Sequence, residues 1–368
     1  MKRLLIVNPT LRVGGVERKI ADIADYLARH PRENTRVDLI LEESPPTDSS
    51  QAIFFKSVQQ SPVHIHFNSL RAIPFFLYLL CQFARLKPDI VLAFSRRPSV
   101  LALTLREILR WRRFRLVLGN DSIASQDLGL YVRHPLVQRI LKTHMQMLYP
   151  RADLILAPSE ISKRDLITHF YVAPEKIRVL KNWTPQIESA ELPKKFDLVY
   201  VGRVDKVKQL ARLVQIAAQV RQAFPQLRVV IVGNGTEMEN VRRATREHGL
   251  EKNIEFVGFQ ANVGTWLAQS KIFCLTSQFE GLPIAALEAM AYGLPIVTFA
   301  YDGAEELVQH GETGLLCANE QEFSEALVTL LADDELRERM GNRAREFVQH
   351  EHGEHVLAQY VDLIFESR

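Results

Sequence analysis

The residues best suited to chemistry lie in one short stretch, in which two acids enclose a glycine and a proline. They are Glu280, Gly281, Leu282, Pro283 and Glu288. The apolar run 272–276 predicts a strand just before them, and proline favours the first turn of a helix. Free amide groups at a helix N-terminus attract anions, and carboxylates accept hydrogen bonds from hydroxyl groups. The stretch therefore predicts a site for a sugar nucleotide, with an ordinary helix start and solvated acids as the alternative.

Two further loops have compositions that suit ligand binding. Gly14 and Gly15 follow a first expected strand and open a helix, where a ligand can approach the backbone closely. Arg203 and Lys208 lie in a later strand-to-helix loop, where fixed cations could neutralise a departing phosphate. The first loop lacks the Gly-x-Gly-x-x-Gly pattern, which disfavours a nicotinamide cofactor.

A polar pair, Asn120 and Asp121, follows another expected strand, 116–118. Ligands of α/β sheets bind beyond the carboxyl ends of the strands, so Asp121 or Asn120 could contact a sugar or an attacking hydroxyl. An Asx turn or a helix cap would explain the pair equally well. The sequence leaves both interpretations open.

Strand-like runs alternate with helical patterns along the whole chain, which predicts parallel sheets covered by helices. The expected strands of the first half are 4–7, 37–41, 63–67, 90–94, 116–118 and 154–157, with a last one beginning at 177. Those of the second half are 196–201, 228–232, 254–256, 272–276 and 295–298, followed by a turn and short strand at 311–316. A polar, turn-rich segment, 185–193, separates the two series and predicts a hinge. The fold class expected from the sequence is therefore α/β with two domains.

Charge is distributed unevenly between the two halves of the chain. Residues 1–185 contain 28 Lys and Arg against 16 Asp and Glu, whereas residues 186–368 contain 18 against 27. A basic first half predicts an anionic partner, although oppositely charged halves could also simply attract each other.

Two stretches of the basic half are expected to be helical and combine basic with apolar or aromatic residues. The stretch 71–87 suits a membrane surface or, equally, a buried crossover helix. The stretch 105–115 places Arg110, Arg112 and Arg113 around Trp111, which suits an anionic membrane surface. Nucleic acid is the weaker alternative, since no known nucleic-acid motif accompanies the charge.

The remaining composition predicts a protein of the cytoplasm. The three cysteines are far apart and predict reduced thiols. The apolar part of the N-terminus is too short for a signal peptide, and no apolar run reaches the ~20 residues of a membrane span. We expect a cytoplasmic protein that associates peripherally with the cytoplasmic face of a membrane.

Taken in order, the motifs resemble those of GT-B glycosyltransferases, most closely the large retaining family 4. The shared elements are the early Gly14-Gly15-x-Glu17, the segment around Ser159, Gly202-Arg203 with Lys208, Gly233-x-Gly235, Glu280-x7-Glu288, and the turn from Gly311 to Leu316. The resemblance implies two Rossmann-like parallel-sheet domains facing a cleft. Residues 1–184 would bind the acceptor, 185–352 the nucleotide sugar, and 353–368 would form a helix that crosses back to the first domain.

The resemblance also implies roles for individual residues of the donor site. Arg203 and Lys208 would hold the diphosphate, and Glu280 would face the donor sugar near the reacting centre. The backbone of 281–282 would approach a phosphate or the sugar, and Glu288 would bind the ribose.

Further implied contacts are made by glycines and by one aromatic residue. The loop at Gly14 and Gly15 would approach the diphosphate, while Gly233 and the backbone at Phe259 would lie by the base. Many family members have a histidine where this chain has Asn120 and Asp121. Asp121 is therefore the candidate for a catalytic polar group of the first domain.

The implied reaction is retaining transfer of a hexosyl or N-acetylhexosaminyl unit from a nucleoside-diphosphate sugar, expected to be UDP-linked. The expected acceptor is a membrane-associated glycolipid or lipid-linked oligosaccharide of cell-surface polysaccharide synthesis. No cofactor beyond the sugar nucleotide is expected, and no metal, because no Asp-x-Asp motif occurs. The alternatives are an epimerase or hydrolase of the same fold, or a non-catalytic module that binds a sugar nucleotide or a membrane surface.

Overall fold

The computed structural model describes residues 1–11, 14–43, 53–68, 74–132, 134–184 and 192–366. The chain forms two compact units, of which unit 1 comprises 1–181 with 355–368 and unit 2 comprises 182–354. The domain boundaries expected from the sequence, after residues 184 and 352, differ from these by a few residues. Most of the expected hinge, 185–191, lies outside the described residues.

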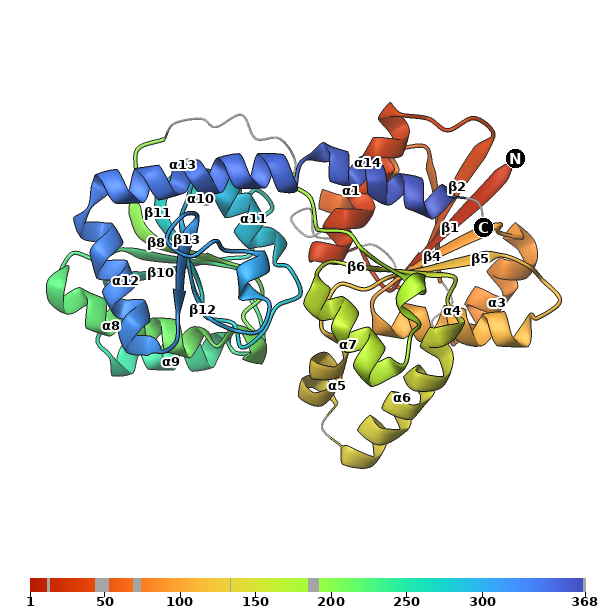
Figure 1. Cartoon of the computed structure of the whole chain (residues 1–368), viewed down its shortest axis with the longest axis horizontal. Helices are drawn as coiled ribbons and strands as arrows, with labels where there is room; N and C mark the ends of the chain where they lie inside the picture. The colour runs from red at the N-terminus through yellow and green to blue at the C-terminus, as the bar shows by residue number, and fades with distance from the viewer. Residues whose placement is uncertain (12–13, 44–52, 69–73, 133, 185–191, 367–368) are drawn as a thin grey trace. The chain divides into compact units, whose positions relative to one another are not determined.

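Unit 1 is built on a parallel sheet of seven strands in the order β3-β2-β1-β4-β5-β6-β7 (Figure 1). The strands are β1 (Lys2–Asn8), β2 (Thr35–Leu41), β3 (Val63–Phe67), β4 (Ile90–Phe94), β5 (Arg115–Gly119), β6 (Leu154–Ala157) and β7 (Ile177–Val179). In the central strand β1, Leu4 pairs with Val37 on one side and with Ile90 on the other. Strands covered on both faces are apolar at consecutive positions, which is why these runs were recognisable in the sequence.

Helices cover both faces of this sheet. They are α1 (Gly15–Arg29), α2 (Ile53–Gln59), α3 (Phe75–Leu86), α4 (Arg96–Ile108), α5 (Ala124–Tyr131), α6 (Pro135–Leu148) and α7 (Glu160–Phe170), with 3₁₀ turns η1 (Tyr149–Arg151) and η2 (Pro174–Lys176). Helices α3, α4, α6 and α7 share one apolar core with the strands. The last helix, α14 (Glu354–Phe365), lies on the opposite face beside α1, and its Tyr360 stacks on Phe94 (Figure 1).

Unit 2 has a parallel sheet of six strands in the order β10-β9-β8-β11-β12-β13. The strands are β8 (Phe196–Val201), β9 (Val229–Val232), β10 (Ile254–Gly258), β11 (Ser270–Leu275), β12 (Ile296–Phe299) and β13 (Gly314–Cys317). The helices are α8 (Leu210–Ala223), α9 (Met238–Glu247), α10 (Gly264–Ala268), α11 (Ile284–Ala291), α12 (Glu320–Ala332) and α13 (Asp334–Glu351), with 3₁₀ turns η3 (Lys206–Lys208) and η4 (Ala304–Glu306).

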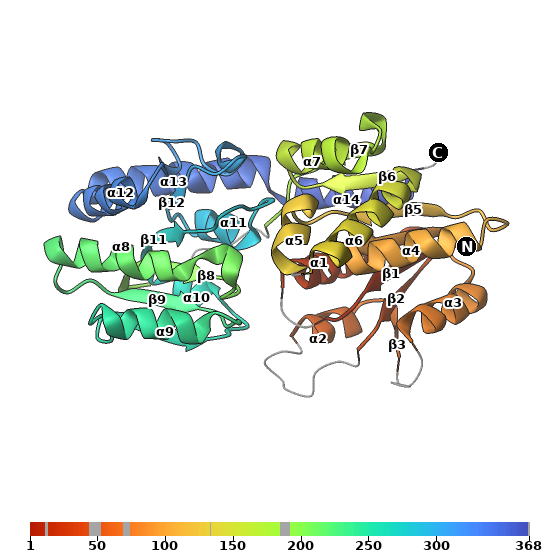
Figure 2. The same cartoon turned by 90° about the horizontal axis from the view of Figure 1, so that it is seen from below.

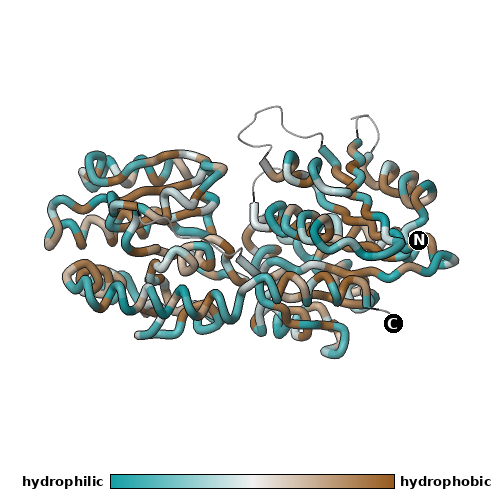
Figure 3. Tube along the Cα trace, turned by 90° about the horizontal axis from the view of Figure 1, so that it is seen from above, coloured by the Kyte–Doolittle hydropathy of each residue, from teal (hydrophilic) through white to brown (hydrophobic). Residues whose placement is uncertain are grey.

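Two apolar cores lie on the two faces of the unit 2 sheet. Helices α8, α9 and α12 contribute to one core, and α10, α11 and α13 to the other. Figure 3 shows the strands of both units as largely apolar segments between helices of mixed hydropathy. The α/β fold class with two parallel-sheet units is thus confirmed.

Of the two helices expected in the basic half, one prediction is wrong, and the other stretch lies partly outside the described residues. The stretch 105–115 is not a single helix, because α4 ends at Ile108 and β5 begins at Arg115. The turn between them buries Phe114 against the edge of Phe83, so this aromatic residue belongs to the core. In the stretch 71–87, residues 71–73 lie outside the described part, and α3 buries the side of the helix that faces the sheet. No helix in the described part of the chain is long and apolar enough to cross a bilayer.

Candidate active site

The site predicted from the sequence forms where two neighbouring strands of unit 2 end. Strands β8 and β11 are paired in parallel, so the loops that follow them emerge at the same edge of the sheet. The hydroxyl of Thr276, just after β11, donates to the carbonyl of Lys208 at 2.8 Å. The amide of Gln278 donates to the carbonyl of Val207 at 2.8 Å. These bonds hold the η3 turn against the loop that contains Glu280.

Glu280 accepts two hydrogen bonds on a single carboxylate oxygen. Lys208 Nζ and Ser277 Oγ each lie 2.5 Å from Oε1. The side chains of Lys208 and Glu280 are 15% and 11% exposed, so this ion pair is mostly shielded from water. An ion pair of low exposure keeps its charges oriented toward a ligand that enters beside it.

The buried Tyr200 and the half-buried Tyr301 both have a raised pKa, to which the charge of Glu280 contributes. Burial chiefly raises the pKa of Tyr200, and the Glu280 carboxylate raises it further. The same two causes, in the same order, raise the pKa of Tyr301. Both phenols therefore stay protonated, and the hydroxyl of Tyr200 donates to the carbonyl of Arg203 at 2.8 Å.

Helix α11 begins directly after the Glu280 loop. Pro283 is the N-cap residue, one position before the first helical turn in which the sequence placed it. The first helical bonds run from the amides of Ala286 and Leu287 back to the Pro283 carbonyl. The amides of 284–285 precede these bonds and can bind an anion at the positive end of the helix. Glu288 is half-buried further along the same helix.

The Glu280 loop is anchored where the chain passes between the two units. Asn182 Nδ2 donates to the carbonyl of the buried Leu282 at 2.5 Å. The carbonyl of Asn182 accepts from Nδ1 of the fully buried His352 at 2.7 Å, and the amide of Thr184 donates to the His352 carbonyl. The segment at Asn182 is thus bonded both to the candidate site loop and to the segment at His352.

Close backbone contacts join the loops after β8, β9 and β10 at the same edge of the sheet. A Cβ on Gly233 would lie 1.9 Å from the Gly202 carbonyl oxygen, and its φ of 140° also favours glycine. The Gly233 amide donates to the carbonyl of Gly258, just before the half-buried Phe259. These glycines let three loops approach one another, beside the largely exposed Arg203 guanidinium, which lies 3.3 Å from Asp205.

A second polar cluster lies at the carboxyl edge of the unit 1 sheet. Lys19, buried on α1 just beyond Gly14 and Gly15, binds Asp121 Oδ1 at 2.6 Å. Oδ2 of Asp121 is buried and accepts no hydrogen bond from the described residues. Asp121 is therefore neither an Asx turn nor a helix cap, and it retains an acceptor atom that a ligand hydroxyl could satisfy.

Comparison with known proteins identifies the family. Residues 184–347 match the model for glycosyl transferases group 1, and residues 13–185 match the model for glycosyltransferase family 4. The chain belongs to the group 1, family 4 glycosyltransferases of GT-B fold. Its two parallel-sheet units are accordingly the two halves of a GT-B enzyme.

Individual relatives of this glycosyltransferase cover most of its length. It is 29% identical over 360 residues to the Campylobacter jejuni N-acetylgalactosamine-N,N'-diacetylbacillosaminyl-diphospho-undecaprenol 4-alpha-N-acetylgalactosaminyltransferase, covering 94% of each chain. It is 31% identical over 262 residues to the Bacillus anthracis N-acetyl-alpha-D-glucosaminyl L-malate synthase, covering 68% of this chain and 65% of that protein. Its fold matches the Anabaena protein HepE in complex with UDP-glucose with a TM-score of 0.81, at 20% identity and 99% coverage of both chains.

Several polar residues of the glycosyltransferase were not singled out as site residues from the sequence. Ser277 could have been found, because it directly follows a predicted strand, as ligand-binding residues often do. Lys19 and Asn182 carried no such signal, since each meets its partner only in the folded chain. The roles assigned to the predicted residues themselves stay predictions.

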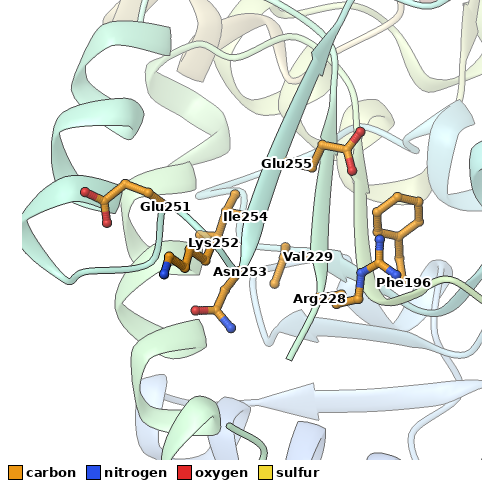
Figure 4. Close-up of a pocket in the computed structure, with 8 residues that line it drawn as sticks. All are labelled: Phe196, Arg228, Val229, Glu251, Lys252, Asn253, Ile254 and Glu255. Carbon is orange, nitrogen blue, oxygen red and sulfur yellow. The ribbon is translucent and has the colours of Figure 1, made fainter. Parts of the chain in front are cut away.

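A hollow of about 250 Å³ lies elsewhere in unit 2 (Figure 4). Its lining residues are Phe196, Arg228, Val229, Glu251, Lys252, Asn253, Ile254 and Glu255. They cluster at the amino ends of β8, β9 and β10, whereas the Glu280 loop lies at the carboxyl ends of the strands. The hollow is therefore not part of the candidate active site.

The pH dependence of stability should reveal the half-buried Glu17, which lies near Asp121 in unit 1. Burial is the main cause that raises its pKa, and the charge of Asp121 adds to it, against hydrogen bonds from Asn8 and Thr10. The folded state therefore binds the Glu17 proton more tightly than the unfolded state does. The stabilisation by this proton is present at low pH and is lost as pH rises above about 4.5. Glu17→Gln should thus stabilise the enzyme increasingly as pH rises above 4.5, until the native carboxyl is ionised in the folded state, as measured by thermal midpoints.

The matched control is Asp25→Asn, which removes a carboxylate from an exposed position of the same helix. This control should show no comparable trend with pH. A midpoint difference between Glu17→Gln and the native enzyme that shrinks as pH rises would contradict the prediction.

Proposed function

We propose that this glycosyltransferase moves a hexosyl or N-acetylhexosaminyl unit from a UDP-linked sugar to a membrane-associated glycolipid or lipid-linked oligosaccharide. The reaction would proceed with retention of configuration and without a metal ion, in the synthesis of a cell-surface polysaccharide. The observation that carries the proposal is the shielded Lys208–Glu280 pair beside the amide groups that open α11. The Campylobacter relative supports the acceptor class, because its name describes transfer to a diphospho-undecaprenol-linked sugar.

In this proposal the donor diphosphate is neutralised by protein groups alone. The Lys208 ammonium has three N–H donors, so it can keep its bond to Glu280 and still reach a phosphate oxygen. Arg203 and the amides of 284–285 add positive potential, which stabilises the charge that develops on the leaving diphosphate. The UDP and UDP-glucose bound by the Anabaena protein support the choice of nucleotide.

The two carboxylate oxygens of Glu280 would have different roles. Oε1 is held by Lys208 and Ser277, which fixes the carboxylate and leaves Oε2 for the donor sugar. A carboxylate at that position favours the positive charge that develops on the sugar ring as the bond to phosphate breaks. The acceptor hydroxyl would attack from the face that the diphosphate leaves, and a phosphate oxygen would take its proton.

Other groups would bind the rest of the two substrates. Glu288 would accept hydrogen bonds from the ribose, and the backbone at Gly233 and Phe259 would border the base. In unit 1, the loop of Gly14 and Gly15 would approach the diphosphate. The unsatisfied Oδ2 of Asp121 would accept a hydrogen bond from a substrate hydroxyl.

A donor screen followed by a transfer assay tests the proposal. A UDP-sugar at 100 times its Kd should raise the melting temperature by roughly 5–10 °C, while GDP-mannose should not. The selected donor, incubated with polyprenyl-diphosphate-linked glycan and excess EDTA, should give an α-linked product, identified by NMR. A β-linked product would refute retention, and loss of activity in EDTA would refute metal independence. Donor turnover that needs no acceptor would favour a hydrolase or epimerase.

A further inference from the structure

Much of the arginine-rich stretch that the sequence predicts to face a membrane is used inside unit 1. Arg106 makes two hydrogen bonds to Asp153, and Arg112 donates to the Phe83 carbonyl. Arg115 donates to the carbonyl of Leu363 in α14 and to that of Glu366 just after the helix. These guanidinium groups hold parts of the unit together, while Trp111 and Arg110 of the same stretch are 75% and 73% exposed.

Helix α6 is apolar on two opposite sides. Met145 and Leu148 are buried and pack in the core of unit 1. Leu136, Ile140 and Met147 are 60%, 57% and 60% exposed, respectively. Spacings of four and seven residues align these three side chains on one face of the helix, which also carries the exposed Thr143 and lies opposite the buried Met145. We call Leu136, Ile140 and Met147 the outer row.

An outward apolar row is unusual for a helix on the surface of a unit. A surface helix normally presents charged and polar residues on the side opposite its core-facing stripe. Figure 2 shows α6 beside α4 on the side of the unit 1 sheet that carries α3 to α7. The outer row therefore offers an elongated apolar surface that a partner could cover.

The charges around the outer row favour an anionic partner. Between His134 and Ala152 the sequence contains Arg139, Lys142 and Arg151 but no Asp or Glu. Each carboxylate of the neighbouring elements forms an ion pair or a hydrogen bond within unit 1. They are Glu107 with Arg110 and Arg151, Asp127 with Ser122, Asp153 with Arg106, Asp165 with Ser125, and Glu160 with Lys163.

We propose that the outer row of α6 docks in the headgroup region of a bilayer containing anionic phospholipids. The apolar side chains enter between the lipids, while Arg139 and Lys142 attract the lipid phosphates. The inference rests on the proposed lipid-linked acceptor, because docking of unit 1 would bring the enzyme to the surface where such an acceptor is held.

Vesicle flotation with the full-length enzyme tests the inference. The native enzyme should float with vesicles of phosphatidylglycerol and phosphatidylcholine, and high salt should weaken the binding. Ile140→Gln/Met147→Gln should bind about tenfold more weakly, because two apolar groups no longer enter the bilayer. Glutamine is a good helix former, so this variant should keep the native melting temperature. Leu77→Gln, on an exposed face of α3, is the matched control and should bind like the native enzyme.

Three outcomes would overturn the inference: no flotation of the native enzyme, equal loss in Leu77→Gln, or equal binding to vesicles of phosphatidylcholine alone. Sedimentation that shows a dimer of the native enzyme and a monomer of the α6 variant would also overturn it, in favour of a second copy of the chain. The melting-temperature response to UDP-sugars needs no vesicles, so it tests the proposed function separately.

Discussion

Replacing Glu280 with glutamine should lower kcat for sugar transfer by about 100- to 1,000-fold, with a smaller change in the KM for the donor. Glutamine can still accept the hydrogen bond from Ser277 and can still bind sugar hydroxyls. It lacks the negative charge that the proposed mechanism places beside the reacting sugar carbon. Steady-state kinetics with the donor identified by thermal shift would measure both constants.

Two further variants separate the charge of Glu280 from its contacts. Ser277→Ala removes one hydrogen bond to Oε1 and should cost less than Glu280→Gln, since Lys208 still holds the carboxylate. Glu305→Gln makes the same chemical change at an exposed position of unit 2 and should leave kcat unchanged. A kcat of Glu280→Gln within about threefold of the native value would remove Glu280 from the mechanism.

Replacing Lys19 with methionine should destabilise the protein by about 3–5 kcal/mol. The substitution leaves the Asp121 carboxylate in a site of low exposure without its cation, and its Oδ2 already accepts no hydrogen bond from the described residues. The loss should appear in the unfolding transition of unit 1, followed by urea denaturation at pH 7. The double variant Lys19→Met/Asp121→Asn should recover part of the stability, because no carboxylate charge is then left without its cation.

The control for this prediction is the adjacent residue of the same helix. Arg18 pairs with Asp22 at 3.2 Å in a more exposed position, so Arg18→Met should cost only about 0–1 kcal/mol. Equal losses in Lys19→Met and Arg18→Met would show that burial does not strengthen the dependence of Asp121 on Lys19.

Most secondary structure could be predicted from local patterns. The strand β4 was predicted at 90–94 and β6 at 154–157, as observed, because buried parallel strands are continuous apolar runs. The prediction failed at 105–115, where the basic and aromatic residues had a helical composition. There Phe114 packs in the core, and three arginines form hydrogen bonds to other elements of unit 1. These tertiary contacts outweighed the local preference for a helix.

The active-site motif shows most clearly which features local sequence determines and which depend on the tertiary structure. The sequence by itself determined that Glu280 lies in a loop between a strand and a helix N-terminus, because an apolar run, a glycine and a proline specify that local geometry. It also placed Lys208 in another strand-to-helix loop. Only the tertiary structure decided that the two side chains meet, because β8 and β11 are neighbours in the sheet although β9 and β10 lie between them in the chain. The order of strands depends on how whole helices pack across the sheet, and no local residue pattern encodes it.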